Sequence, residues 1–187
     1  TDEPKVPYTI IYKGRNWVLA ESEGFAFPTL YADGHNAVIL YNKQPDGSFA
    51  YTIGKKSEFI PYFPVGPHSK PDTILSFLNG HEKGWGGGST IGGAPRNSDG
   101  SRSRLTPQSI IALVSIALGQ GEDLVYCASE VRLCDNLVTG EDTLCSECSP
   151  GEEHIGAEDA EIPEMMNDEV LQAARAAAEE AKKEELN

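Results

Sequence analysis

The chain has 187 residues, 39% of them hydrophobic, and carries 29 acidic against 15 basic side chains, for a formal net charge of −14 at pH 7. A chain of this length can bury a core, while its negative charge argues against bulk electrostatic binding to nucleic acid or to an anionic membrane. The charge is uneven, because residues 1–121 carry 10 acids and 11 bases whereas residues 122–187 carry 19 acids and 4 bases. We therefore expect a main domain over 1–121 and an acidic extension over 122–187.

The first part of the chain predicts two β-hairpins. Residues 7–12 and 17–20 are rich in β-branched and aromatic residues and are separated by a short segment with turn chemistry. Residues 37–41 are a continuous apolar run of strand length, and residues 49–53 follow across Pro45-Asp-Gly47. Proline and glycine in that connection favour a tight turn, so these two runs are expected to pair.

Two helices are predicted further along. A proline-rich connection over 61–70 leads to a short helix that begins at Asp72 as its cap, runs to Asn79 and ends at Gly80. A second helix begins with Thr106 and Pro107 and runs to Gly119; because it is apolar on nearly all sides, it should be buried. Together these elements predict an α/β fold with a small mixed sheet and flanking helices.

The segment between the two helices, residues 83–96, is rich in glycine. Glycine lets backbone amides face a ligand, and successive amides can bind an anion. Hydroxyl groups adjoin the glycines as further donors, and the flanking arginines make the region locally positive. The candidate ligand-binding residues are Gly86, Gly87, Gly88, Ser89, Thr90, Arg96, Arg102 and Arg104. The alternative is a flexible or close-packed glycine loop whose charges are merely solvated.

The order of strand, short helix and glycine-rich segment resembles DHHA1, the C-terminal substrate-binding domain of DHH phosphoesterases. In that family, a basic-ended strand and a short helix precede a Gly-Gly-Gly-His motif and a small-residue turn, which contact the phosphate or base of the substrate. The resemblance covers about residues 8–114. The matching positions are Gly54–Lys56 at the strand end, Gly86–Gly88 at the triple glycine and Gly92–Ala94 at the small-residue turn.

The chain departs from the family in two ways. Ser89 stands where the motif has histidine. The Asp-His-His triplet of the catalytic domain is also missing, and a two-metal hydrolytic site needs several carboxylates and histidines around its metals. The four histidines are instead scattered singly, as His35, His68, His81 and His154. We therefore expect no hydrolysis by this chain alone, and a complete phosphoesterase only if a longer chain or a partner supplies the metals.

The acidic extension contains all four cysteines, spaced C-x6-C-x10-C-x2-C: Cys127, Cys134, Cys145 and Cys148. Four thiolates fit a closed structural zinc site, and a metal can fold a segment that is poor in apolar residues. Two disulfides, or unbridged and redox-active thiols, are the alternatives, and His154 could replace one cysteine as ligand. Residues 168–186 predict a peripheral helix rich in alanine, glutamate and lysine, capped by Asn167 or Asp168.

Two further pairs of residues have open interpretations. Trp17 and Trp85 could stack on a base, although tryptophans usually belong to the core. Lys55 and Lys56 fit either a solvated strand end or a clamp on a ligand.

The leading functional hypothesis is a module that binds a phosphorylated nucleotide or a short oligonucleotide without hydrolysing it. The alternative is a structural or assembly protein that keeps this fold as a scaffold and docks on a protein partner, or on a second copy, through residues 122–187. Residues 1–5 lack the basic and apolar regions of a signal peptide, and a zinc-like cysteine pair favours a reducing compartment. We expect a cytoplasmic protein that does not enter the membrane.

Overall fold

The computed structural model describes residues 4–126, 136–139 and Ala176. Within them lie the following elements in chain order: β1 (Thr9–Lys13), β2 (Val18–Glu21), α1 (Phe27–Ala32), β3 (Ala37–Lys43), β4 (Phe49–Lys55), α2 (Ile74–His81), β5 (Gly86–Gly87), β6 (Ile91–Gly93), α3 (Pro107–Ala117), the 3-10 helix η1 (Gly121–Asp123), β7 (Leu124–Tyr126) and β8 (Leu137–Thr139). The predicted helix over 168–186 lies outside the described residues, except for Ala176, which is helical.

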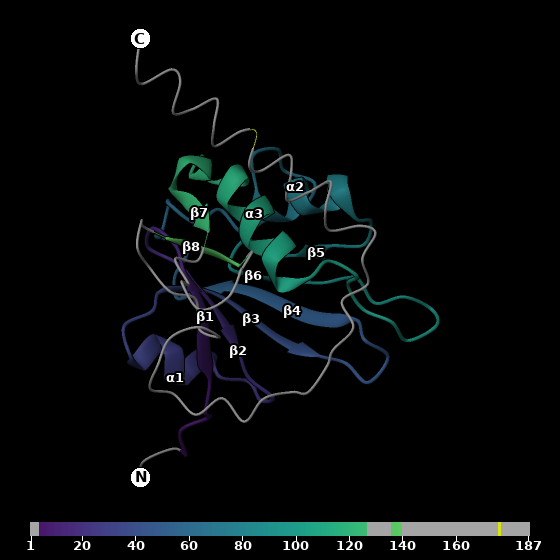
Figure 1. The fold of residues 1–187 in the computed structure, drawn as a ribbon, viewed down its shortest axis with the longest axis horizontal. Helices are drawn as coiled ribbons and strands as arrows, with labels where there is room; N and C mark the ends of the chain where they lie inside the picture. Colours follow the sequence, from purple (N-terminus) through teal and green to yellow (C-terminus); the bar gives the residue numbers. More distant parts are fainter. Residues whose placement is uncertain (1–3, 127–135, 140–175, 177–187) are drawn as a thin grey trace.

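Six strands form one mixed sheet in the order β1-β2-β3-β4-β6-β5 (Figure 1). Strands β2 and β3 are parallel, and the other neighbouring pairs are antiparallel. The predicted mixed α/β class is confirmed. Both predicted hairpins are present as well, namely β1 with β2 and β3 with β4.

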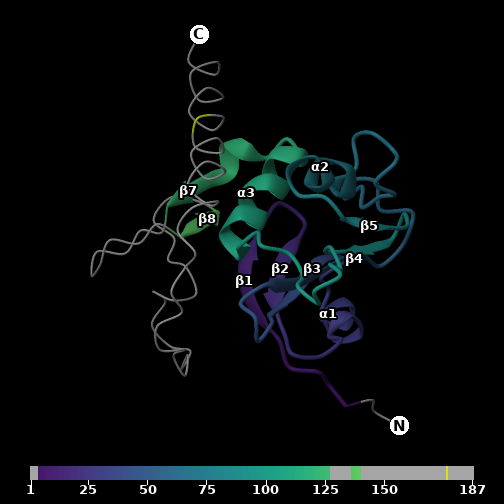
Figure 2. The same cartoon turned by 90° about the vertical axis from the view of Figure 1, so that its right-hand side faces the viewer.

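Helices cover both faces of this sheet, with α1 on one side and α2 and α3 on the other (Figure 2). Side chains alternate along a strand, so neighbouring residues contribute to different cores. Leu19 and Ile39 belong to the larger core, which includes residues of α2 and α3. Val18 and Val38, one residue earlier on the same strands, pack with Phe27 and Leu30 of α1.

Helix α1 is absent from the prediction. It makes the crossover that the parallel β2–β3 pair requires. It has only six residues, and its first turn lacks both a side-chain cap and an acidic residue. Pro28 near its start is therefore the one usual signal of a helix start that it carries.

The start of α2 corrects one prediction. Thr73, not Asp72, caps the helix, because its Oγ1 accepts a hydrogen bond from the Ser76 amide at 3.2 Å. Asp72 has φ = +64°, a left-handed conformation outside the helix. The helix also continues through Gly80 to His81.

Helix α3 agrees with its prediction. Thr106 Oγ1 accepts from the Ser109 amide at 3.3 Å, and Pro107 occupies the first turn. All residues from 109 to 115 are buried. Gly119 has φ = +69°, as expected where a glycine ends a helix.

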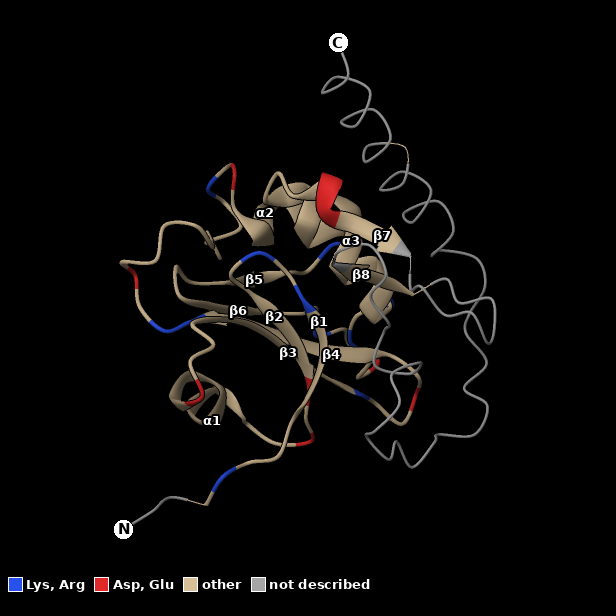
Figure 3. Ribbon diagram, turned by 60° about the vertical axis from the view of Figure 1, so that its left-hand side comes forward, with Lys and Arg blue, Asp and Glu red and all other residues tan. Residues whose placement is uncertain are grey.

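The compact part of the molecule extends past residue 121. Strands β7 and β8 form a small second sheet, and Leu124 and Leu137 join the larger core. Two acids of η1, which is drawn red in Figure 3, pair with the turn between β1 and β2: Arg15 Nη2 lies 2.8 Å from Asp123 Oδ1 and 3.2 Å from Glu122 Oε1. None of the helices in the described part of the chain is long and apolar enough to cross a membrane.

Candidate functional site

The glycine-rich segment is a β-hairpin rather than a loop. Strands β5 and β6 pair antiparallel, and β6 pairs with β4. The chain reverses over Gly88–Thr90, where the Gly88 amide donates to the Ile91 oxygen at 2.8 Å. The sequence analysis missed these two strands because glycine is depleted in strands and supplies no alternating side chains.

Packing explains several of these glycines. Gly87 has φ = +152° and lies opposite Gly92, so that a Cβ atom there would overlap the Gly92 backbone. A Cβ on Gly92 would overlap Leu75 of α2, and one on Gly66 would lie 2.7 Å from the Gly88 oxygen. The predicted alternative of a close-packed glycine segment therefore describes the body of the hairpin, while the turn at its end lies at the surface.

The turn Gly88–Thr90 carries the donor groups that the sequence singled out. Ser89 Oγ donates to Glu58 Oε1 at 2.8 Å. Within the described residues, the amides of Ser89 and Thr90 have no hydrogen-bond acceptor. The Thr90 oxygen accepts from the Lys55 amide at 2.9 Å, which joins the turn to the end of β4.

The two lysines at the end of β4 have different environments. Lys55 Nζ donates to the Ile60 oxygen at 2.9 Å, and burial lowers the pKa of this ammonium, with Lys70 adding to the decrease and Glu58 opposing it. Lys56 is exposed, and only its backbone is tied down, by a 2.9 Å hydrogen bond from its amide to the Asn36 oxygen. Of the two lysines, Lys56 is therefore the one whose side chain faces solvent, and it follows in sequence the residue that is bonded to the turn.

The three candidate arginines lie at the opposite end of β4. Ser103 pairs with Phe49, the first residue of that strand, whereas the glycine turn is bonded to Lys55, its last. Six residues along a strand span about 20 Å. The structure thus brings Gly86–Thr90 together with Lys55 and Lys56, and places the arginines of the segment 96–104 elsewhere.

Arg102 is engaged by the protein itself. Its Nε donates to the Pro95 oxygen at 2.9 Å and its Nη2 to the Ala94 oxygen at 3.4 Å. Partial burial, with a smaller contribution from Arg96, lowers the pKa of this guanidinium. Arg96 and Arg104 are exposed.

Beside the arginines, Glu82 accepts three hydrogen bonds. Its Oε1 accepts from Trp85 Nε1 at 3.0 Å and from Ser103 Oγ at 2.6 Å, and its Oε2 accepts from the Arg104 amide at 2.8 Å. These bonds connect the end of α2 with the hairpin and with the segment that leads to α3. Both carboxylate oxygens of Glu82 are therefore occupied by donors of the protein itself.

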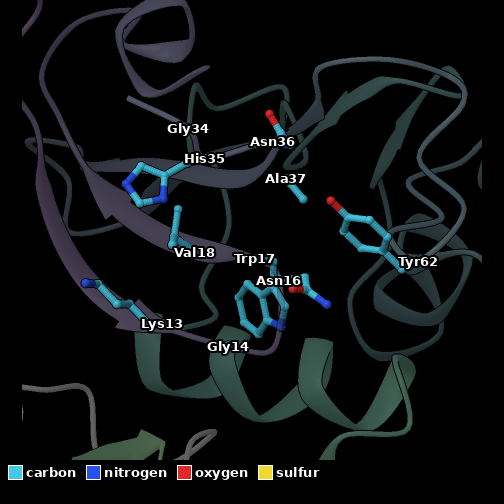
Figure 4. Close-up of a pocket in the computed structure, with 10 residues that line it drawn as sticks. All are labelled: Lys13, Gly14, Asn16, Trp17, Val18, Gly34, His35, Asn36, Ala37 and Tyr62. Carbon is cyan, nitrogen blue, oxygen red and sulfur yellow. The ribbon is translucent and has the colours of Figure 1, made fainter. Parts of the chain in front are cut away.

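Figure 4 shows a pocket of about 270 Å³. It lies at the same end of the sheet as the glycine turn, because Ala37, which lines it, pairs with Lys55, and the Lys55 amide is bonded to Thr90. The sequence analysis missed it because its walls come from three separate connections: the β1–β2 turn, the segment before β3 and the loop after β4. Its lining residues are Lys13, Gly14, Asn16, Trp17, Val18, Gly34, His35, Asn36, Ala37 and Tyr62.

The suggestion that Trp17 or Trp85 stacks on a base is corrected by the structure, because both ring faces are buried. Trp17 and Trp85 are 3% and 1% exposed, and both belong to the larger core. Trp17 Nε1 donates to Gln120 Oε1 at 3.0 Å, and this bond fixes the indole at the edge of the pocket.

The predicted metal ligands Cys127, Cys134, Cys145 and Cys148 lie outside the described residues, as does His154. Zinc therefore stays a prediction. Among residues 4–126 and 136–139, no three His, Cys, Asp or Glu side chains come together as a metal site.

No family model, curated protein or solved structure matches this chain. The resemblance to DHHA1 therefore rests on the motif residues alone. Since a fold class by itself does not define an activity, the function has to be argued from the chemistry of the sheet end described above.

Proposed function

We propose that this chain is a phosphate- or nucleotide-binding module, similar in role to the DHHA1 substrate-binding domain, whose anion site is the turn Gly88–Thr90 together with Lys56. The observation that carries the proposal is the grouping of donors at this turn. Two amides that have no acceptor within the described part of the chain, the Ser89 hydroxyl and the exposed Lys56 side chain lie at one end of the sheet. Amides, hydroxyls and lysines are among the groups that bind phosphate oxygens in proteins.

The contact between Ser89 and Glu58 shows that the serine hydroxyl is oriented toward an anionic oxygen. A bound phosphate replaces the Glu58 carboxylate as the acceptor of this hydroxyl. The negative charge of Glu58 then repels the phosphate. Glu58 therefore weakens binding, while Lys56 strengthens it. Both effects are electrostatic and become smaller as salt is added.

Isothermal titration calorimetry with AMP and with the dinucleotide pApA tests the proposal. Lys56→Ala should weaken binding of both by about tenfold, Glu58→Gln should strengthen it, and added NaCl should weaken it. Arg104→Ala is the matched control, because it removes an exposed cation about 20 Å away along β4. An equal loss in the Arg104 variant would move the site to the arginine end, and the absence of heat with either compound would overturn the proposal.

A second candidate is the assembly protein that uses this fold as a scaffold, and the packing of Gly87 and Gly92 is compatible with it because it explains both glycines without a ligand. In that case the glycines serve only the hairpin, and residues 122–187 hold a partner or a second copy. Deleting residues 140–187 separates the two functions. Loss of the oligomeric state with unchanged AMP binding assigns assembly to the extension, whereas unchanged size in analytical ultracentrifugation contradicts self-assembly through it.

A further inference from the structure

The pocket at the end of the sheet has a lining suited to a planar, acceptor-rich ring. None of its ten lining residues is acidic, and they include the side-chain amides of Asn16 and Asn36 and the imidazole of His35. Figure 4 shows Tyr62 on the side of the pocket opposite His35, with Trp17 between them. Tyr62 is 44% exposed, so its ring can contact a ligand.

These groups match the chemistry of a nucleobase. A base offers carbonyl and ring-nitrogen acceptors at its edge to amide and imidazole donors, and a flat face on which an aromatic side chain stacks. The volume of about 270 Å³ lies just below the roughly 300–1,000 Å³ of pockets for drug-sized ligands. The pocket therefore suits one base rather than a larger molecule.

The floor of the pocket is held rigidly by the protein. Gly14 packs so closely over Trp17 that a Cβ atom there would overlap the indole, and the indole is bonded to Gln120. Asn16, at the corner of the same turn, has φ = +65°, a conformation that asparagine tolerates better than most residues. A site that is formed before its ligand arrives loses less entropy on binding.

Backbone contacts join the wall of the pocket to the proposed phosphate site. Ala37, which lines the pocket, pairs with Lys55 across β3 and β4, and the Lys56 amide donates to the Asn36 oxygen. The Lys55 amide in turn is bonded to Thr90 of the glycine turn. Two strand spacings, about 10 Å, separate the pocket wall from the turn. The sugar of a nucleotide lies between its base and its phosphate and can bridge these two places.

We propose that this pocket, with Tyr62 as its aromatic wall, binds the base of a nucleoside phosphate whose phosphate lies at the Gly88–Thr90 turn. The inference rests on the proposed function and identifies the ligand class as nucleotides rather than phosphorylated compounds in general. Asn16, Asn36 and His35 donate to the edge of the base. Phe59, on the same loop as Tyr62 and 93% exposed, is not among the residues that line the pocket.

Calorimetry with four probes tests the inference: AMP, ribose 5-phosphate, inorganic phosphate and adenosine. Tyr62→Ala should weaken AMP binding about tenfold and leave ribose 5-phosphate unchanged. Tyr62→Phe, which keeps the ring, should retain most of the affinity, and Phe59→Ala is the control for loss of an exposed aromatic from this loop. Equal affinity of the wild type for AMP and ribose 5-phosphate, or equal weakening of both by Tyr62→Ala, would overturn the base site.

The same titrations distinguish failure of the base site from failure of the proposed function. If ribose 5-phosphate binds but AMP binds no better, the phosphate site stands and the base site falls. If none of the three phosphates binds, the proposed function falls. Adenosine then decides the pocket: binding that is lost in Tyr62→Ala supports it, and no binding overturns it.

Discussion

The two ends of strand β4 carry similar residue types but use them differently. At the end near Phe49, Glu82 accepts three hydrogen bonds from protein donors, and Arg102 donates to two backbone oxygens. At the end near Lys55, Glu58 accepts a single bond, from Ser89. At the first end, Glu82 and Arg102 are saturated by protein groups, although Arg96 and Arg104 are exposed. At the second end, the amides of Ser89 and Thr90 have no acceptor within the described residues.

This difference decides which charged groups are candidates for binding. A side chain whose donors already face protein acceptors would have to give up those bonds to hold a ligand, at a cost of about 1–3 kcal/mol for each polar group left without a partner. Arg102 is such a side chain. The Ser89 hydroxyl would likewise have to release Glu58, whereas the amides of Ser89 and Thr90 and the exposed Lys56 side chain bear no such cost. Arg96 and Arg104 are exposed and bear no such cost either, so what favours the glycine turn as an anion site is its two adjacent amides, which lack an acceptor within the described residues.

The largest expected effect comes from removing the acceptor at the saturated end. Glu82→Ala leaves the buried donors of Trp85 and Ser103 without their acceptor and should lower the free energy of unfolding by about 3 kcal/mol. Urea denaturation followed by tryptophan fluorescence measures this change. Glu58→Ala, at the other end, is the matched control and should change stability by less than about 0.5 kcal/mol. Similar losses in the two variants would show that the ends do not differ.

Strands with an alternating or a continuous apolar pattern of side chains could be predicted from the sequence. The β-branched and aromatic residues of 37–41 and 49–53, with the Pro-Asp-Gly connection between them, predict two paired strands. The Thr106-Pro107 pair predicts the start of α3. The glycine hairpin could not be predicted in this way, because it depends on the close approach of Gly87 to Gly92 and on the packing of Gly92 against Leu75. Such contacts between distant residues leave no local pattern.

The candidate site was predictable only in part, for the same reason. The glycines, Ser89 and Thr90 are contiguous in sequence and lie together at one end of the sheet. The arginines are near them in sequence but about 20 Å away, because β6 carries the chain back along β4. The pocket draws on the β1–β2 turn, the segment before β3 and Tyr62, and only the strand order brings these together.

An alanine at Gly87 should have the next largest effect and should connect stability with binding. The new Cβ would overlap the Gly92 backbone at a φ of +152°, so we expect a loss of roughly 2 kcal/mol and a displaced Gly88–Thr90 turn. AMP binding should weaken with it. Gly80→Ala is the control: Gly80 lies within α2 with no atom near a new Cβ, and the change should stabilise the protein by roughly 0.5–1 kcal/mol. A Gly87 variant as stable as the wild type would contradict the packing of the hairpin.

The smallest expected effect is a dependence on pH at the arginine end. Asp46 Oδ1 accepts from the amide and hydroxyl of Ser48, and Asp99 Oδ1 accepts from the same groups of Ser101; these hydrogen bonds lower the pKa of both carboxyl groups.

Because the folded state favours their ionised form, these carboxylates stabilise the protein above the ordinary aspartate pKa of 3.8, and the stabilisation is lost as pH falls through the lowered values. The double variant Asp46→Asn and Asp99→Asn should therefore lose stability at pH 7 and approach the wild type at pH 3. Melting temperatures at both pH values measure this. A constant difference between wild type and variant would show that the turns depend on the shape of the aspartate side chain and not on its charge, since asparagine keeps the acceptor oxygen but cannot ionise.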